Sequence, residues 1–238
     1  MGSFETAELA FVHRFLRTGV TVLDVGAHHG LYTLLASKRV GKRGQVFSFE
    51  PSPRDRRALR LHIILNWCWN VVAQRCALGN ENGHAELFVV QGSQTACNSL
   101  RPPIVESGTA RVRVQIIRLD DWVAEQKIGT VDFIKLDVEG AEMAVLEGAT
   151  KLLERKPRPV ILAEVQDLRT EPWGYKAKEI LIHLDARGFK WFRLVAGGEL
   201  EYLDLSPLRF DGNFVAFPEE RLDLARPLLH NGSHAAVS

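Results

Sequence analysis

The sequence predicts a single α/β domain in which a mostly parallel sheet is covered by helices on both faces. Short apolar runs alternate with helical patterns along most of the 238 residues. The first apolar run leads into an acid and a glycine turn, residues 22–30, and acidic side chains follow several later runs. Ligands of open α/β sheets bind beyond the carboxyl ends of the strands, so we expect the site along that edge.

The composition suits a globular domain without a strong overall charge. Hydrophobic residues make up 46% and charged residues 25% of the chain, and the formal net charge is +1. A balance so close to neutral gives no general electrostatic reason to expect nucleic acid or a membrane as partner. We therefore expect a small-molecule partner, no nucleic acid and no membrane, and leave a homo-oligomer open.

Targeting and metal signals are weak. No apolar run approaches the roughly 18 residues of a membrane span, and the N-terminal residues lack the pattern of a secretion signal. The three cysteines, Cys68, Cys76 and Cys97, have no metal-ligand spacing, which is typical of reduced thiols in a cytoplasmic protein. The sequence therefore predicts a cytoplasmic location and no structural metal.

The first part of the chain follows a strand–helix–strand rhythm after an amphipathic helix at residues 4–17, within an N-terminal helical region 1–19. The elements expected next are a strand at 20–25, a helix at 31–39, a strand at 45–49, a helix at 55–66 and a strand at 71–76.

The rhythm changes between residues 80 and 118. Residues 85–90 and 111–118 read as two strands with no helix between them, which predicts a small antiparallel insertion. A long polar loop joins them and includes Asn98 and Ser99. Loops of this length in compact domains are often functional, so these two side chains are candidates for contact with a ligand.

The alternation then resumes and completes one domain over residues 1–230, followed by a small polar tail, 231–238, that we expect to be disordered. The later elements expected are a helix at 121–126, a strand at 131–137, a helix at 141–155, a strand at 160–165, a helix at 176–186, and strands at 189–195 and 213–217.

The turn after the first strand indicates a nucleoside site. It contains Asp24, Gly26, His28 and Gly30, and His28 occupies the place where dinucleotide-binding turns have glycine. A side chain there suits two phosphates poorly, which favours S-adenosylmethionine over NAD. Asp24 could accept a hydrogen bond from an ammonium group of the cofactor or simply orient the loop.

Glu50 is expected to bind the same nucleoside as this turn. It ends the second strand, 26 residues after Asp24, close to the spacing at which an acid meets a cofactor ribose. A carboxylate can accept hydrogen bonds from both ribose hydroxyls. The alternative is that Glu50 caps the following helix, but its pairing with the glycine turn favours the ribose.

A second group of charges lies on the strand at 131–137 and beyond. Lys135 and Asp137 point to the same side of that strand, Glu139 follows, and Glu164 lies in the next strand. Buried charges are costly unless they are satisfied, so these residues form either a structural ion pair or a reactive centre. The candidate catalytic acids are Asp137, Glu139 and Glu164, in that order; binding of Mg²⁺ by their oxygens is a less favoured alternative.

Two further features have plain structural interpretations. Arg54, Arg56, Arg57 and Arg60 form a basic run typical of a solvated helix face. The segment 67–69, Trp-Cys-Trp, is more often packed in a core than used to stack on bases.

Taken together, these residues resemble the FkbM family of S-adenosylmethionine-dependent methyltransferases over about residues 19–195. The matching segments are Asp24-Val25-Gly26, Phe49-Glu50-Pro51, Ala77-Leu78-Gly79, Leu119-Asp120-Asp121, Ile134-Lys135-Leu136-Asp137-Val138-Glu139-Gly140-Ala141-Glu142, Val145-Leu146-Glu147-Gly148-Ala149 and Pro159-Val160-Ile161-Leu162-Ala163-Glu164.

The resemblance implies a Rossmann-like class I methyltransferase fold, with seven strands, the last of them antiparallel. It also implies S-adenosyl-L-methionine as cofactor, with Ala77 among its contacts, and O-methylation of a hydroxyl on a sugar or polyketide-type molecule. His28 stands where the family usually has asparagine. A non-catalytic module that binds the cofactor is the first alternative, and an NAD-dependent enzyme is a weaker one.

Overall fold

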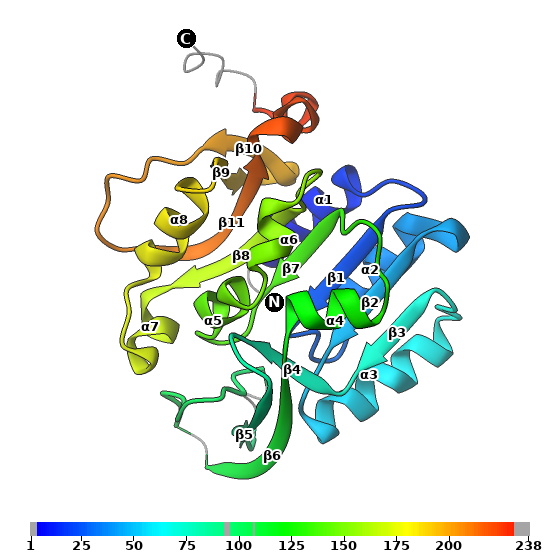
Figure 1. The fold of residues 1–238 in the computed structure, drawn as a ribbon, viewed down its shortest axis with the longest axis vertical. Helices are drawn as coiled ribbons and strands as arrows, with labels where there is room; N and C mark the ends of the chain where they lie inside the picture. The colour runs from blue at the N-terminus through cyan, green and yellow to red at the C-terminus, as the bar shows by residue number, and fades with distance from the viewer. Residues whose placement is uncertain (1–3, 93–95, 107, 231–238) are drawn as a thin grey trace.

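The computed structural model describes residues 4–92, 96–106 and 108–230, which form two sheets with flanking helices (Figure 1). The larger sheet has eight strands in the order β10-β9-β11-β8-β7-β1-β2-β3. Its strands are β1 (Thr21–Val25), β2 (Gln45–Phe49), β3 (Val71–Gln74), β7 (Phe133–Leu136), β8 (Val160–Gln166), β9 (Phe189–Val195), β10 (Glu199–Tyr202) and β11 (Asp211–Pro218).

The directions of the strands confirm the expected class. Strands β3, β2, β1, β7 and β8 pair in parallel, and β11 runs antiparallel to both β8 and β9. The prediction of seven strands is short by one, because β10 pairs with β9 at the edge of the sheet. This strand follows a tight turn at residues 196–198 and has no helix before it, so the alternation of strands and helices did not reveal it.

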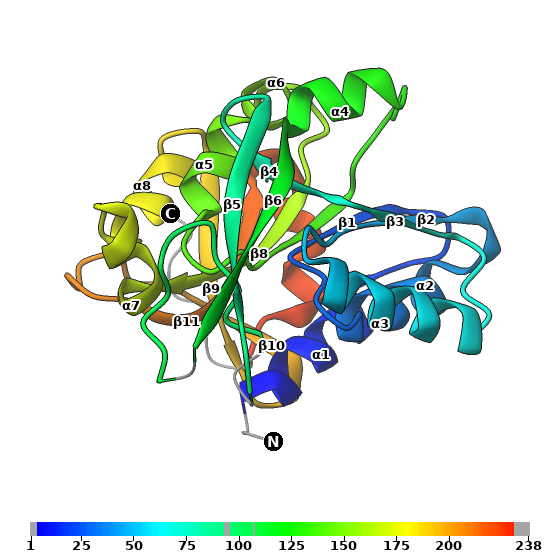
Figure 2. The same ribbon diagram turned by 90° about the horizontal axis from the view of Figure 1, so that it is seen from below.

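Helices cover both faces, as Figure 2 shows, with α1, α2 and α3 on one side of the sheet and α4, α5 and α6 on the other. The helices are α1 (Phe4–Phe15), α2 (Leu31–Val40), α3 (Pro53–Leu65), α4 (Leu119–Glu125), α5 (Glu142–Glu147), α6 (Thr150–Glu154), α7 (Asp167–Thr170) and α8 (Ala177–Asp185). None of the helices in these described ranges is long and apolar enough to cross a bilayer.

The helix expected over 141–155 is two helices, α5 and α6. The backbone at Gly148 lies against the chain of the second sheet, where an added Cβ would be 2.0 Å from the carbonyl oxygen of Gly79. The buried carboxylate of Asp120 then accepts hydrogen bonds from the amides of Lys151 (2.9 Å) and Leu152 (3.0 Å) and starts α6. Both partners are distant in sequence, so the local helical pattern could not show the break.

The smaller sheet comprises β4 (Cys76–Gly79), β5 (Gly83–Val90) and β6 (Thr109–Arg118), in the order β4-β6-β5. The antiparallel pairing of β5 with β6 confirms the predicted insertion. The strand expected at 71–76 is wrong as a single element. It divides after Gln74, and β4 leaves the large sheet to pair in parallel with β6.

Two apolar cores, one on each face of the large sheet, fix the strand ends. On one face, the ring of Trp122 makes edge-on contacts with Phe47 and Phe49, with centroids 5.0 and 4.9 Å away. Each such aromatic pair contributes roughly 0.5–1.5 kcal/mol beyond area burial. They hold the end of β2, and therefore Glu50, in one position. The predicted tail, 231–238, lies outside the described residues.

Candidate functional site

A cavity of about 380 Å³ lies at the carboxyl ends of β1, β2 and β7, beneath the smaller sheet. Most of the residues predicted for the site line it: Gly26, His28, Glu50, Ala77, Asp137, Glu139 and Glu164. Asp24 and Gly30 lie behind the lining, and the topology therefore brings both predicted groups of residues to one place.

The glycine turn fits tightly between two strand ends. Gly26 has a φ of 84°, and its amide donates to the carbonyl oxygen of Phe49 at 3.1 Å. A Cβ built on Gly26 would lie 1.7 Å from the carbonyl oxygen of Asp137. Only glycine allows this approach, so Gly26 connects the end of β1 with the ends of both β2 and β7.

Glu50 anchors the turn from the other side. Its two carboxylate oxygens accept the backbone amides of His28 and Ser52, each at 2.8 Å. Burial raises the pKa of Glu50 to about 7. Each oxygen keeps a second lone pair, and the residue lines the cavity, so it can also accept hydrogen bonds from a ribose. The contact with Ser52, whose own side chain accepts the amide of Asp55 at the start of α3, means that both roles considered for Glu50 are compatible.

Asp24 has a different position from the one expected of a direct cofactor ligand. Its side chain is buried and accepts a hydrogen bond of 2.5 Å from the hydroxyl of Thr33, which also lies 2.7 Å from the hydroxyl of Ser48. Burial raises the pKa of Asp24 to about 6. This geometry favours the role of orienting α2 behind the turn, whereas contact with the cofactor stays a prediction.

Asp137, Glu139 and Glu164 converge on the opposite wall, with carboxylate oxygens within 4.8 Å of one another. Two cations accompany them. Lys135, almost fully buried, donates to Asp137 at 2.8 Å, and the Nε of Arg169 lies 2.9 Å from Glu139. The ion pair of Lys135 with Asp137, which was the structural alternative for these residues, is present, and both acids of the functional alternative line the same cavity.

The protonation of these acids follows from burial and crowding. Burial opposes ionisation of Asp137, but the ammonium of Lys135 outweighs it and holds the pKa of Asp137 below its ordinary value. Burial and the neighbouring charge of Asp137 raise the pKa of Glu139 to about 8. The same causes raise the pKa of Glu164 well above its usual range. Near neutral pH this wall therefore retains protons on Glu139 and Glu164.

Lys135 and Arg169 also make binding of a metal ion by the three acids less favourable. Oxygens at this separation match the ligand spacing of a divalent ion. Lys135 and Arg169 already occupy two of the three carboxylates, so an ion would have to displace both contacts. The donor set fits protons and ion pairs better than it fits Mg²⁺.

A short turn directs Glu139 into the cavity. Glu139 has a φ of 55° and is followed by Gly140 with a φ of 98°. The buried carboxylate of Glu142 accepts the amides of Val138 (3.0 Å) and Gly140 (3.3 Å), and the hydroxyl of Tyr175 donates to the carbonyl of Gly140 at 2.6 Å. The turn is therefore fixed by side chains from two later elements.

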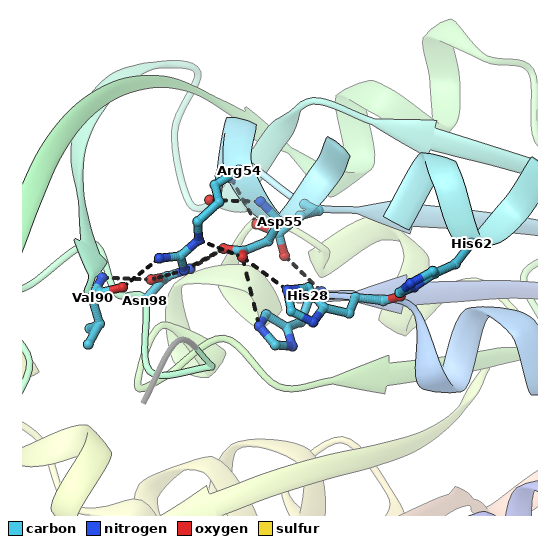
Figure 3. A network of polar contacts seen from close by, with 9 residues as sticks. His28, Arg54, Asp55, His62, Val90 and Asn98 are labelled. Carbon is cyan, nitrogen blue, oxygen red and sulfur yellow. Dashed lines mark hydrogen bonds and ion pairs between the residues drawn. The ribbon is translucent and has the colours of Figure 1, made fainter. Parts of the chain in front are cut away.

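A polar network that the sequence did not reveal borders the cavity through His28, His29 and Asn98 (Figure 3). The buried carboxylate of Asp55 accepts from the amide of Asn98 at 2.6 Å and from the guanidinium of Arg54 at 2.8 and 3.0 Å. The ring of His29 lies 3.3 Å from Asp55 and stacks on His28, with centroids 3.7 Å apart. Asp55 thus connects the glycine turn with the long loop of the insertion.

The long loop reaches both walls. Asn98 contacts the cofactor side through Asp55, while the hydroxyl of Ser99 donates to the carbonyl of Glu139 at 2.9 Å. The sequence did identify these two loop residues as candidates. A local signal for Asp55 existed as well, since Ser52 three residues before it is the start of a helix-capping pattern. No motif or spacing in the neighbouring sequence identifies Arg169 as a residue of the site.

The strand order, with β11 antiparallel between β8 and β9, is that of the class I methyltransferase fold. The profile of the Methyltransferase FkbM domain matches residues 24–191, and the chain belongs to that family. Its cofactor is S-adenosyl-L-methionine.

Two curated relatives illustrate the family. The chain is 28% identical to "31-O-demethyl-FK506 methyltransferase FkbM" of Streptomyces tacrolimicus, over 64% of this chain and 68% of that protein. It is 27% identical to "2-O-methyltransferase NoeI" of Sinorhizobium fredii, over 56% of this chain and 59% of that protein. The most similar regions therefore span only part of each relative.

The fold also matches solved structures. Methyltransferase FkbM from Methylobacillus flagellatus superposes with a TM-score of 0.51 at 15% identity, over 89% of this chain and 51% of that one. The structure titled "putative rRNA-methylase" from Clostridium thermocellum gives a TM-score of 0.53 at 13% identity, over 91% of this chain and 97% of that one. At these identities the likeness concerns the fold alone.

Proposed function

We propose that this methyltransferase transfers the methyl group to a hydroxyl oxygen of a sugar or polyketide-type small molecule. The observation that carries the proposal is the wall of Asp137, Glu139 and Glu164, which faces the cofactor turn across one cavity and includes, in Glu139, a carboxyl group with a pKa of about 8 that can accept a proton once it is ionised. An alcohol is a weak nucleophile, so its methylation benefits from a nearby proton acceptor. Two relatives whose names specify O-methylation support the same choice.

The cofactor supplies a methyl group that is already activated as part of a sulfonium. The chain must therefore hold the nucleoside, align the acceptor and remove one proton. Glu50 and the amides around Gly26 suit the nucleoside, since they line the cofactor side of the cavity. The apolar side chains of Leu87 and Leu100, from the insertion and its loop, line the cavity and exclude water.

Among the three acids, Glu139 is best suited to accept the proton. A general base works best with a pKa near the working pH, and the pKa of Glu139 is about 8. Asp137 is held ionised by Lys135 and is the weaker base. Glu164, protonated, hydrogen-bonds to Asp137 and further lowers the basicity of that carboxylate. With the cofactor bound, the ionised form of Glu139 would take the hydroxyl proton while the acceptor oxygen receives the methyl group.

The competing proposal is a module that binds the cofactor without turnover. The test first measures binding of S-adenosylmethionine, S-adenosylhomocysteine and NAD by calorimetry, and then methyl transfer from labelled cofactor to a panel of sugar and polyketide alcohols, amines and thiols. We expect binding of the first two ligands and label in an alcohol. Label only in amines or thiols would contradict O-methylation, and binding without turnover across the panel would favour the module.

A further inference from the structure

An exposed surface with apolar and basic side chains lies away from the cavity, on α3, β3 and the turn between them. It exposes apolar side chains beside arginines, and we call it the Trp–Arg face: Leu61, Ile64, Leu65, Trp67, Trp69 and Val72 with Arg56, Arg57, Arg60 and Arg75. Trp67 is 74% and Trp69 82% exposed, so the expectation that this segment packs in a core is wrong for both rings.

The local backbone explains why the two rings point outward. The amides of Trp67 and Cys68 bond to the carbonyls of Ile64 and Ile63 and close the last turn of α3, and Trp67 has a φ of 52°. Cys68 is turned inward and is 2% exposed, so its two neighbours face solvent. Strand β3 follows at the outer edge of the large sheet, where no further strand covers it (Figure 1).

The charges of this face are of one sign. Residues 53–75 contain five arginines and a single acid, Asp55, which is buried and paired with Arg54. Within the described residues, Arg56, Arg57, Arg60 and Arg75 form no ion pair. Burial and the positive charge of Arg75 lower the pKa of Arg56. The molecule is near neutral overall only because acids elsewhere balance this face.

Further cations border the tryptophans on the side of α2. The amide of Asn70 donates to the carbonyls of Ser37 (3.1 Å) and Gly41 (2.9 Å), which holds the turn against the end of that helix. Lys38 and Lys42 are exposed there. Lys38 and Lys42 therefore add positive charge on the α2 side of the turn that carries the two rings, and the arginines supply it on the α3 side.

Apolar side chains surrounded by cations match one kind of partner best. A nucleic acid would engage the arginines and stack on the rings, but it offers nothing to Leu61, Ile64 and Leu65. A second copy related by a two-fold axis would place the same arginines opposite each other. A membrane interface accepts tryptophan and aliphatic side chains at the depth of the headgroups, and anionic lipids attract the arginines.

We propose that the Trp–Arg face docks the protein peripherally on an anionic lipid surface. Trp67 and Trp69 enter the headgroup region, the aliphatic side chains at the end of α3 follow, and the arginines contact lipid phosphates. The expectation of no membrane partner rested on the net charge of the whole chain, which conceals this separation of charge. In the first turn of α3, Asp55 contacts Asn98 and His29, which line the cavity, so α3 connects the docking face with the lining of the site.

The test is co-sedimentation of the full chain with phosphatidylcholine vesicles that contain or lack phosphatidylglycerol, followed by tryptophan fluorescence. We expect binding that needs phosphatidylglycerol and weakens with salt, together with a blue shift of the emission. Trp122 and Trp191 are already buried, at 2% and 3% exposure, but Trp173 is half-buried. The shift is therefore assigned to the face by its loss when Trp67 and Trp69 are replaced.

Paired variants separate the two contributions. Trp67→Ser with Trp69→Ser should weaken vesicle binding about tenfold for each ring, and Arg57→Glu with Arg60→Glu about fivefold for each charge removed. The matched controls are Leu208→Ser, at a leucine elsewhere that is 75% exposed, and the pair Lys151→Glu, on α6, with Arg155→Glu, directly after that helix. Circular dichroism and S-adenosylmethionine binding verify that each variant is folded.

Several outcomes would overturn the proposal. They are no binding to vesicles with phosphatidylglycerol, equal binding to vesicles without it, or equal losses in the control variants. Self-association in sedimentation velocity that both face variants abolish, without vesicle binding, would assign the face to a second copy. Binding of single-stranded RNA in place of vesicles, lost with the arginines, would assign it to nucleic acid.

Discussion

The two walls of the cavity are built by different means. The cofactor wall, at the ends of β1 and β2, is shaped by backbone: the positive φ of Gly26, its close approach to Asp137, and two amides on Glu50. The opposite wall, at the ends of β7 and β8, is shaped by charged side chains, in which Lys135 and Arg169 offset three acids.

The two walls therefore depend on different kinds of residue. A backbone wall depends on residues that are neighbours in sequence and on the absence of a side chain. A wall of charges depends on which cation lies beside which acid, and therefore on residues that only the fold brings together. Changes to the first wall should act on binding, whereas changes to the second should act on turnover and its pH dependence.

The largest effect is expected where the walls meet. In Gly26→Ala the new Cβ would overlap the carbonyl oxygen of Asp137, so either the turn or the end of β7 must move. We expect cofactor affinity to fall at least about 10³-fold, a loss of about 4 kcal/mol, measured by calorimetry. Gly83→Ala is the control, because a Cβ at Gly83 meets nothing within 4 Å. Similar affinities for both variants would mean that the close approach of Gly26 to Asp137 is not needed for cofactor binding.

A large effect on turnover alone is expected at Glu139. Glu139→Gln keeps the size of the side chain but cannot accept the proton, so kcat should fall about 10²–10⁴-fold with cofactor affinity nearly unchanged. Glu139 must be ionised to act, and its pKa is about 8. The kcat of the wild type should therefore rise as the pH increases from 6 to 9.

The variant tests this interpretation through its pH profile. In Glu139→Gln the rise of kcat near pH 8 should disappear, whereas a merely structural role would lower kcat and leave the profile in place. Glu147→Gln, at the exposed last residue of α5, serves as the control. A retained rise near pH 8 in Glu139→Gln would transfer the role of base to another group.

The sequence predicted the cofactor wall better than it predicted the wall of charged side chains. The glycine turn and Glu50 were readable because spacing and strand position define them locally. The neighbours of Glu139 were not, since Arg169 comes from α7, a four-residue helix without a periodic pattern. The fold was predicted well where strands and helices alternate. It was not where tertiary contacts interrupt an element, as at Gly148, or where turn geometry exposes Trp67.

An intermediate effect is expected at Glu50, confined to binding. Glu50→Ala removes the acceptor for the amides of His28 and Ser52 and for the ribose. Hydrogen bonds to a charged group are worth about 1.5–3 kcal/mol, so affinity for S-adenosylmethionine should fall about 10–100-fold. Glu86→Ala, an exposed acid of the insertion, is the control. Unchanged affinity in Glu50→Ala would remove the ribose role and leave only the helix start.

The smallest effect is expected at the network that joins the long loop to the cofactor wall. Asp55→Asn keeps the shape of the side chain but loses the charge that binds Arg54 and the amide of Asn98. Since this network holds His29 and Asn98 in the cavity lining and lies outside the catalytic acids, KM for the cofactor should rise about three- to tenfold with kcat unchanged. Asn98→Ala should have a similar effect.

The double variant decides whether the two residues act through their mutual contact. Groups that share one interaction give non-additive effects, so Asp55→Asn with Asn98→Ala should raise KM little more than either change alone. Asn98 also accepts the amide of Val90 at 2.9 Å, a bond within the insertion that Asp55→Asn leaves intact. Fully additive effects would therefore mean that Asn98 acts by shaping its own loop, and that the cofactor wall is complete without it.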